Sequence, residues 1–339
     1  MRKYLLSQNG NFYKANLHCH TVLSDGAKRP EEVKEIYQEL GYSVVAYTDH
    51  DILVPHNDLT DENFLALNGF EMSIIEDRAK GGYKICHLCI IALDPENIIQ
   101  PFWHRELYLF GNAPKNRHLV KFDENEPDYV REYTGEAISY VIQGCREKGF
   151  FITYNHPTWS RENYNDYMSY NGMHAMEIVN GGSLVSGYEE YNAKEYDDML
   201  TGGKKIYCIA ADDNHNRREK TSRYSDAGVA FTMIKAEKLE YETITKALTD
   251  GHFYASQGPE IHSLWFEDGK IHITCSPADR VYINTGRRRA VCEYAENGEL
   301  LTEVTFRVDP KDVYVRITVI DEKGYPANTN AYFTDELFD

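Results

Sequence analysis

The sequence lacks long apolar runs, an ordered set of cysteines and any surplus of positive charge. Its first residues, MRKYLLSQNGNFYK, contain one short apolar pair, so we expect neither a signal peptide nor a membrane-spanning segment. The 7 cysteines are an odd number without regular spacing, and most lie in apolar runs where a free thiol behaves as a small buried hydrophobe. We therefore expect a cytoplasmic protein with reduced thiols and no contact with a membrane.

The balance of charge excludes a further class of partner. The 36 basic residues against 54 acidic ones give a formal net charge of −18. A field of this sign repels polyanions, so extended nucleic acid is disfavoured as a partner. A carboxylate-rich metal pocket can still accept one phosphate group, because bound cations reverse the local potential.

The first two thirds of the 339 residues alternate strand-like and helix-like patterns. A strand leads into His18, and Pro30 opens a helix whose apolar stripe recurs at helical spacing as far as Leu40. The apolar run 43–47 follows as the next strand. About seven strands alternate with helices in this way, which favours a parallel α/β barrel. The stretch 94–133 breaks the rhythm and is interpreted as an insertion over the mouth of the barrel.

The pattern changes after Gly258–Pro259. Strand-length runs at 271–275, 280–283, 302–308 and 313–320 follow one another without helical periodicity. In the last run apolar and polar residues alternate, which predicts a half-buried strand. We therefore predict two domains, an α/β barrel over 1–258 and a small antiparallel, sandwich-like β domain over 259–339.

Residues of the metal-ligand type occur at intervals along the predicted barrel, almost all directly after a short hydrophobic run. They are His18, His20, Asp25, His50, Glu71, His87, His156, Asp213 and His215. Ligands at the ends of successive strands meet at the carboxyl-end mouth of an α/β barrel. The mixture of imidazole and carboxylate suits Zn²⁺, Mn²⁺ or Fe²⁺ and argues against an iron–sulfur site.

Each of these residues also has an ordinary structural interpretation. A single histidine can be a buried strand residue bonded to a carbonyl group, which is an open alternative for His87. The carboxylates Asp25, Glu71 and Asp213 could be turn or helix caps. Asp49, in the run TDHD, is interpreted as a residue that orients a ligand.

The motifs NLHCHTVLSDG, AYTDHD, NGFE, NHP and ADDNH resemble, in order, the motifs of the PHP (polymerase and histidinol phosphatase) superfamily. The resemblance covers about residues 14–258. It implies a metal-dependent phosphoesterase on a distorted seven-stranded (β/α) barrel. The segments HFYASQGPEI and VRITVIDEKGYPANTNAYF resemble the barrel end and the appended β domain of two-domain members.

The resemblance also implies a distribution of ligands over two or three divalent ions. One ion would lie on His18, His20, Glu71 and Asp213, a second on Glu71, His87 and His156, and a third on Asp25, His50 and His215. Asp25 stands where some relatives have histidine, which leaves the number of ions open. Catalysis would proceed through a metal-activated water held by the first set. Arg217, Arg218 and Arg117 are candidate phosphate holders.

Three functions are compatible with these observations. The leading one is a phosphoesterase that acts on a small phosphorylated metabolite or a short nucleotide. A second is an ester, amide or carbamate hydrolase at the same site, because a metal-activated hydroxide also attacks carbonyl carbon. The third is a non-catalytic, metal-stabilised binding module.

Overall fold

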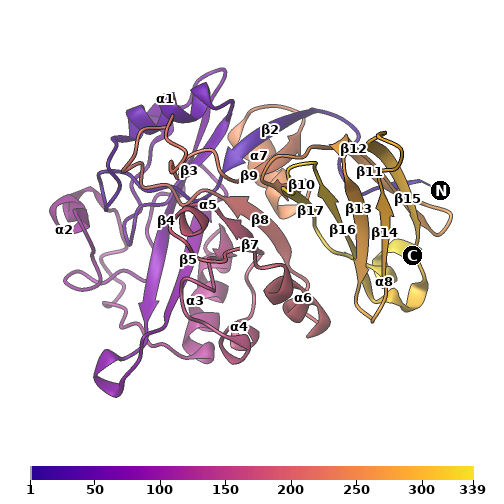
Figure 1. The fold of residues 1–339 in the computed structure, drawn as a ribbon. Coiled ribbons are helices and arrows are strands. Elements are labelled where there is room, and N and C mark those ends of the chain that lie inside the picture. The colour runs from indigo at the N-terminus through magenta and orange to yellow at the C-terminus, as the bar shows by residue number, and fades with distance from the viewer. Residues whose placement is uncertain (1) are drawn as a thin grey trace.

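The computed structural model describes residues 2–339, which form a mixed α/β molecule with two β-sheets (Figure 1). The strands are β1 (Lys3–Tyr4), β2 (Asn11–Asn16), β3 (Val44–Tyr47), β4 (Leu65–Ile75), β5 (Ile85–Ala92), β6 (Phe150–Tyr154), β7 (Ala175–Asn180), β8 (Tyr207–Ala211), β9 (Phe231–Ala236), β10 (Phe253–Ser256), β11 (Ile261–Glu267), β12 (Lys270–Ala278), β13 (Arg280–Thr285), β14 (Ala290–Tyr294), β15 (Leu301–Arg307), β16 (Tyr314–Ile320), β17 (Pro326–Thr329) and β18 (Tyr332–Phe333).

The α-helices lie mainly in the first two thirds of the chain. They are α1 (Pro30–Glu39), α2 (Ala113–Asn116), α3 (Gly135–Glu147), α4 (Tyr164–Ser169), α5 (Gly181–Val185), α6 (Ala193–Thr201), α7 (Tyr241–Thr249) and α8 (Thr334–Phe338), with 3-10 turns at Asn57–Leu59, Arg78–Lys80, Arg117–Leu119 and Pro310–Asp312. The predicted helix at Pro30 is confirmed as α1, which buries Val33 and Tyr37. Gly41 follows it with a φ of 79°, a left-handed conformation that favours glycine. None of the described helices is both long and apolar enough to cross a membrane.

The larger sheet has the order β14-β13-β16-β17-β10-β9-β2-β3-β4-β5-β6-β7-β8. Strands β2, β3 and β4 are parallel, and so are β6, β7 and β8, but β5 runs antiparallel to both of its neighbours. The prediction of a parallel barrel is therefore wrong at β5. Both strands of the β4–β5 hairpin are buried almost throughout, so their apolar runs carry no signal of strand direction.

The two ends of the parallel region come together at one edge of the sheet. Beyond the ends of β2 and β8, Cys19 and Asn214 form a parallel bridge. Between β8 and β9 the hydroxyl of Thr232 donates to the carbonyl oxygen of Ala210 and accepts from its N–H, at 2.9 and 3.1 Å. Within residues 2–339, β8 forms no ladder with β2 or β9. A closed seven-stranded barrel is therefore not confirmed, and the sheet is curved with a seam at β8.

The last third of the chain forms antiparallel strands in both sheets, as its sequence predicts. The smaller sheet has the order β1-β11-β12-β15 and packs against β13, β16 and β17 through one shared core cluster. Strand β10 pairs with β17, so the larger sheet continues through position 258 without a break. The N-terminal strand β1 pairs with β11, and both chain ends lie beside these sheets in Figure 1. The division into domains at residue 258 stays a prediction.

Two local expectations have different outcomes. The half-buried strand predicted at 313–320 is wrong, because every residue of β16 is buried. The polar side chains of β16 form hydrogen bonds inside the protein rather than with solvent. Arg316 donates to both carboxylate oxygens of Asp197 on α6, at 2.7 and 2.6 Å, and Thr318 donates to Oδ1 of Asn328 at 2.9 Å. The stretch 94–133, between β5 and α3, contains α2 and one 3-10 turn, and its interpretation as an insertion stays a prediction.

Candidate metal centre

Two pairs of predicted ligands lie on adjacent segments at the seam of the larger sheet. His18 and His20 follow β2, and Asp213 and His215 follow β8. The N–H of Asp213 donates to the carbonyl oxygen of His18, and the N–H of His20 donates to that of Asn214, both at 3.0 Å. Asp213 has a φ of 50°, so its segment is not extended, and these two hydrogen bonds hold the two segments together at the site.

Glu71 and His87 lie diagonally across the β4–β5 hairpin, because Glu71 pairs with Cys89 and His87 pairs with Ser73. Strand β4 continues to Ile75, so Glu71 lies inside the strand and the expectation that it ends a short run is wrong. His87 lies near the start of β5. Because β5 runs antiparallel, its beginning lies at the edge where the parallel strands end, which brings His87 to the same site.

The first predicted ligand set converges in the structure. Nε2 of His18 lies 3.1 Å from Oε1 of Glu71 and 3.3 Å from Oδ1 of Asp213. Nε2 of His20 lies 3.0 Å from the same Asp213 oxygen and 3.3 Å from Oε2 of Glu71. All but Asp213 have fully buried side chains.

The second set shares Glu71 with the first. Nδ1 of His87 and Nε2 of His156 lie 2.9 and 3.2 Å from Oε1 of Glu71, and 3.3 Å from each other. His156 follows β6 with a φ of 29°, an uncommon conformation for a side chain of this size. Oε1 of Glu71 therefore contacts nitrogens of His18, His87 and His156, and Oε2 contacts those of His20 and His50.

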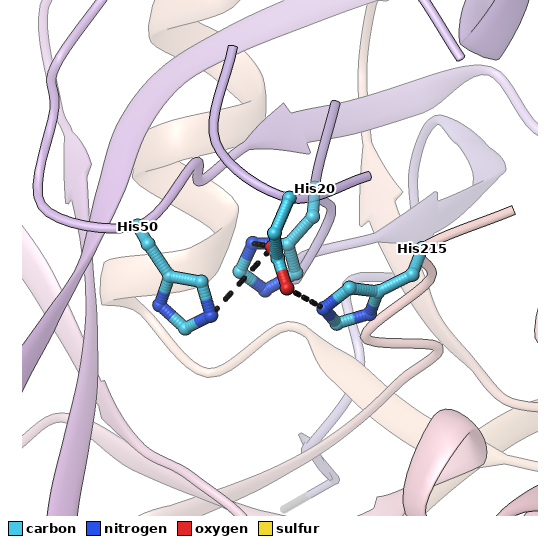
Figure 2. A group of neighbouring side chains, drawn as sticks. His20, His50 and His215 are labelled. Atoms are coloured by element: carbon cyan, nitrogen blue, oxygen red, sulfur yellow. Dashed lines mark ion pairs between the residues drawn. The ribbon is translucent and has the colours of Figure 1, made fainter. Parts of the chain in front are cut away.

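The third set surrounds Asp25, and the rings of His20, His50 and His215 converge on one point (Figure 2). Nε2 of His215 lies 3.0 Å from Oδ2 of Asp25, and the nearest nitrogens of His20 and His50 lie 3.8 Å from Oδ1. These four residues offer ligand atoms within 4.8 Å of one another. The structure thus brings all nine predicted ligand residues into one continuous cluster.

The charges of the cluster support cation binding. Burial opposes ionisation of the carboxyls of Glu71, Asp213 and Asp25, but the neighbouring histidines hold the pKa of each below its ordinary value. Burial lowers the pKa of His50 to about 3, which keeps its ring neutral. Although burial opposes it, the neighbouring carboxylates raise the pKa of His18, His20 and His156. A bound divalent ion would therefore take the place of the protons that these rings hold.

Unpartnered polar atoms show that these residues fit a bound ion. Among the described residues, Nδ1 of His20, Nδ1 of His50 and Oε2 of Glu71 are buried and form no hydrogen bond, although Nδ1 of His50 lies 3.1 Å from Oε2 of Glu71. Buried polar atoms are rarely left without a partner in folded proteins, and a metal ion is one that would satisfy them. A donor set of imidazole and carboxylate suits Zn²⁺, Mn²⁺ or Fe²⁺.

Asp49 supports the centre through a loop. Its carboxylate accepts hydrogen bonds from the backbone and hydroxyl groups of Thr21 and Ser24, at 2.6 to 3.1 Å. These bonds fix the loop that presents Asp25, so Asp49 orients a predicted ligand indirectly.

The sequence reasoning missed Glu177. This residue is buried in β7, and its Oε1 lies 2.7 Å from Nδ1 of His18. The signal in the sequence was a glutamate inside the apolar run AMEIVN, which follows no polar motif.

A cavity of about 1020 Å³ opens on the cluster. Its walls include Tyr108, Leu109 and Phe110 of the insertion, and Trp159 beside His156. The ring of Phe110 meets that of His50 edge-on at 5.6 Å, and its side chain is largely exposed. Residues 108–110 of the stretch 94–133 therefore form part of the wall of the cavity.

The arginines near the cluster have different surroundings. Arg78, Arg217 and Arg218 line the cavity, and Nη2 of Arg217 lies 3.2 Å from Oδ2 of Asp25. Arg117 does not line the cavity, and its guanidinium donates to backbone carbonyls of the insertion, including that of Glu106 at 3.1 Å.

No family model matches the chain, and no curated protein matches it. Solved structures that resemble it include PHP-like metal-dependent phosphoesterases. A two-domain protein from Bacteroides vulgatus ATCC 8482, described as containing a predicted enzyme of this kind, is 14% identical with a TM-score of 0.43, over 98% of this chain and 90% of that one.

Two further structures match a smaller part of the chain. A putative metal-dependent phosphoesterase from Bifidobacterium adolescentis ATCC 15703 is 15% identical with a TM-score of 0.40, over 63% of this chain and 90% of that one. An amidohydrolase from Chromobacterium violaceum, with bound sulfate and no metal, is 17% identical with a TM-score of 0.37, over 59% and 87%. Because these identities and TM-scores are low, the chemistry of this chain has to be argued from its own side chains.

Proposed function

We propose that this protein is a metal-dependent hydrolase that cleaves a phosphoester bond of a small phosphorylated metabolite or nucleotide. The observation that carries the proposal is the convergence of six histidines and three carboxylates at one end of a cavity. His18, His20, Glu71 and Asp213 would hold one divalent ion, His87 and His156 with Glu71 a second, and Asp25, His50 and His215 a third.

The residues of the chain prepare the site for this reaction. With a divalent ion held by these residues, the pKa of a bound water molecule would be lowered, which would supply a nucleophile at neutral pH. The two oxygens of Glu71 contact different histidines, Oε1 a nitrogen of His87 and Oε2 a nitrogen of His20, so one carboxylate would serve neighbouring ions. Burial of this carboxylate excludes bulk water from the centre, which strengthens its electrostatic interactions.

The charge on the cavity wall favours a phosphoester over a neutral ester or amide. Most acidic side chains of the wall are engaged by the cluster or by other partners: Asp51 pairs with Arg131, and Asp226 accepts backbone N–H groups of residues 215 and 216. Arg78, Arg217 and Arg218 also line the cavity, and Arg78 and Arg218, which do not pair with the cluster as Arg217 does, suit the oxygens of an anionic substrate. The volume of the cavity, about 1020 Å³, is large enough for a substrate of nucleotide size.

The test combines metal analysis with phosphate release. Protein purified without chelator is assayed for Mn, Fe and Zn, and phosphate release is measured on a panel of phosphomonoesters and phosphodiesters with each metal supplied. For His18→Ala we expect loss of bound metal and a fall in phosphate release on the order of 100-fold or more, because a group that acts in the transition state is removed.

The control is His262→Ala, which removes an exposed histidine on β11, far along the chain from the cluster. It should retain both metal and activity. Bound metal without release of phosphate from any panel member would overturn the proposed reaction, and wild-type protein that takes up no metal would overturn the site.

A further inference from the structure

Glu177 is the single charged residue of β7, and its side chain is fully buried. Its Oε1 lies 2.7 Å from Nδ1 of His18. Its Oε2 accepts hydrogen bonds from the backbone N–H of His156 at 3.1 Å and from Nδ2 of Asn180 at 2.8 Å. One carboxylate therefore contacts two predicted ligands that arrive from different strands.

The contact with His18 decides which ring nitrogen can bind a metal. An ionised carboxylate accepts hydrogen bonds and cannot donate them, so Nδ1 of His18 must carry the shared hydrogen. In a neutral ring the lone pair then lies on Nε2, the atom that faces Glu71 and Asp213 at 3.1 and 3.3 Å. The carboxylate of Glu177 thus selects the tautomer that a metal needs.

The contact with His156 acts on the backbone. His156 has a φ of 29°, a conformation that costs free energy and needs support from its surroundings. The hydrogen bond from its N–H to Glu177 provides such support. Asn180 extends the network, because its Nδ2 also lies 3.2 Å from Oδ2 of Asp213.

Glu177 is close enough to His18 and His156 to be considered a ligand itself. Its hydrogen bonds argue for a different role, because three donors already occupy its two oxygens. In addition, the nitrogen of His18 that it contacts is not the one that faces the other carboxylates.

We propose that Glu177 is a positioning residue of the metal centre, which fixes the tautomer of His18 and the backbone of His156 so that both rings are ready to bind. This inference rests on the metal-dependent function proposed above. It adds a residue from β7, a strand that contributes none of the nine predicted ligands.

The substitution Glu177→Gln keeps the shape of the side chain but replaces one of its two accepting oxygens with an NH₂ donor. An amide has one accepting oxygen, so it cannot accept from His18 on one side and from His156 and Asn180 on the other. If its NH₂ group faces His18, Nδ1 of the ring must accept, and the hydrogen moves to Nε2. If the NH₂ group faces the other way, it meets the N–H of His156 and Nδ2 of Asn180, which are also donors, so no hydrogen bond forms there.

The experiment measures affinity for Zn²⁺ and Mn²⁺ by competition with a chromophoric chelator. We expect Glu177→Gln to weaken binding about 10- to 100-fold, the usual effect of losing a partner that orients a ligand. The matched control is Glu162→Gln, another buried carboxyl, whose partners are tyrosine hydroxyls that can rotate to suit an amide. It should bind both metals as the wild type does.

A second readout separates positioning from general loss of structure. In Zn²⁺-loaded protein labelled with ¹⁵N-histidine, His18 should show a protonated Nδ1, and this signature should be lost in Glu177→Gln. Glu177→Asp, which keeps the charge, should restore part of the affinity and serves if the glutamine variant does not fold. Equal metal affinity in wild type and Glu177→Gln would overturn the inference.

The outcome of phosphate release is independent of this test. A wild type that binds metal more tightly than Glu177→Gln but releases no phosphate would leave the positioning role intact and contradict the proposed reaction. A wild type without metal affinity would contradict both.

Discussion

Glu162 is a buried carboxyl outside the metal cluster, enclosed by the phenol groups of three tyrosines. The hydroxyls of Tyr133 and Tyr154 donate to its oxygens at 2.7 and 2.6 Å, and that of Tyr170 donates as well. Burial raises the pKa of Glu162 to about 7, although the phenols oppose this by stabilising the ionised form. The residue therefore changes charge in the physiological range.

We predict that Glu162 makes the stability of the fold depend on pH. Because its pKa is higher in the folded protein than the usual 4.5, its contribution is fully present below about pH 4.5 and is lost as pH rises through about 7. The difference of about 2.5 pKa units corresponds to about 3 kcal/mol. In Glu162→Gln this dependence should disappear, so the free energy of unfolding of the variant relative to wild type should rise between about pH 5 and pH 8.

The measurement is urea unfolding of both proteins in chelator across that range. Comparing the two curves removes the contributions of the other titrating groups, including the histidines of the cluster. Parallel curves for variant and wild type would contradict the prediction.

Single residues were predictable where the chemistry lies in short polar motifs. His18, His20, His50, His156 and His215 stand in such motifs directly after apolar runs, so their positions follow from the strand pattern. Glu177 and Glu162 did not stand out, because a buried acidic residue and an exposed one look alike in a sequence. Only the folded chain shows which donors surround each carboxylate.

The insertion between β5 and α3 is the element that shapes the cavity. Its segment 108–110 lines the wall, and its end is fixed by a buried ion pair between Arg131 and Asp51, the residue after His50. Nη1 of Arg131 also donates to the carbonyl oxygen of Ser73 at 2.7 Å. A second tie is Gln100, whose side chain bonds the backbone of Asp51 and Leu53 at 2.9 and 2.7 Å.

We predict that Arg131→Met loosens the insertion and leaves the metal ligands in place. The substitution leaves the buried Asp51 without its partner charge, which costs about 3 to 5 kcal/mol. Hydrogen exchange of residues 101–112 should become faster, while metal content is unchanged. The double variant Arg131→Met/Asp51→Asn should recover much of the lost stability, because it removes the unpaired charge.

Unchanged exchange in the single variant would show that Gln100 and the packing of the insertion suffice to hold it. Equal destabilisation in the single and double variants would show that the lost packing of Arg131, and not the unpaired carboxylate, sets the cost.

Elements were predictable where periodicity or a cap marks them. Helix α1 begins at Pro30 and ends before Gly41, and the strands of the last third alternate or end at turns. The direction of β5 was not predictable, because a strand buried on both faces is apolar throughout and lacks the polar–apolar alternation typical of antiparallel strands. The turn between β4 and β5, residues 76–84, sets that direction, and its sequence does not distinguish a hairpin from a longer connection.

Residues 2–258 and 259–339 share both sheets, two core clusters and a partly buried ion pair. One core cluster joins Val33 and Val45 with Ile317. Arg316 on β16 donates from Nε and Nη2 to the two carboxylate oxygens of Asp197 on α6. The prediction of two domains rests on the change from helical to strand-like patterns near residue 258. Such a change does not reveal whether strands on its two sides pair with each other, as β10 and β17 do.

We predict that residues 1–258 do not fold alone and that the full chain unfolds in one cooperative transition. Truncation after 258 would expose the edge of β10, leave Asp197 without Arg316, and remove Asn330, whose side chain donates to the carbonyls of Gly251 and Phe253 at 3.0 and 3.1 Å. Calorimetry of the full chain in chelator should give equal calorimetric and van't Hoff enthalpies. Two separable transitions, or a soluble 1–258 fragment that binds metal, would show instead that the halves are independent domains in contact.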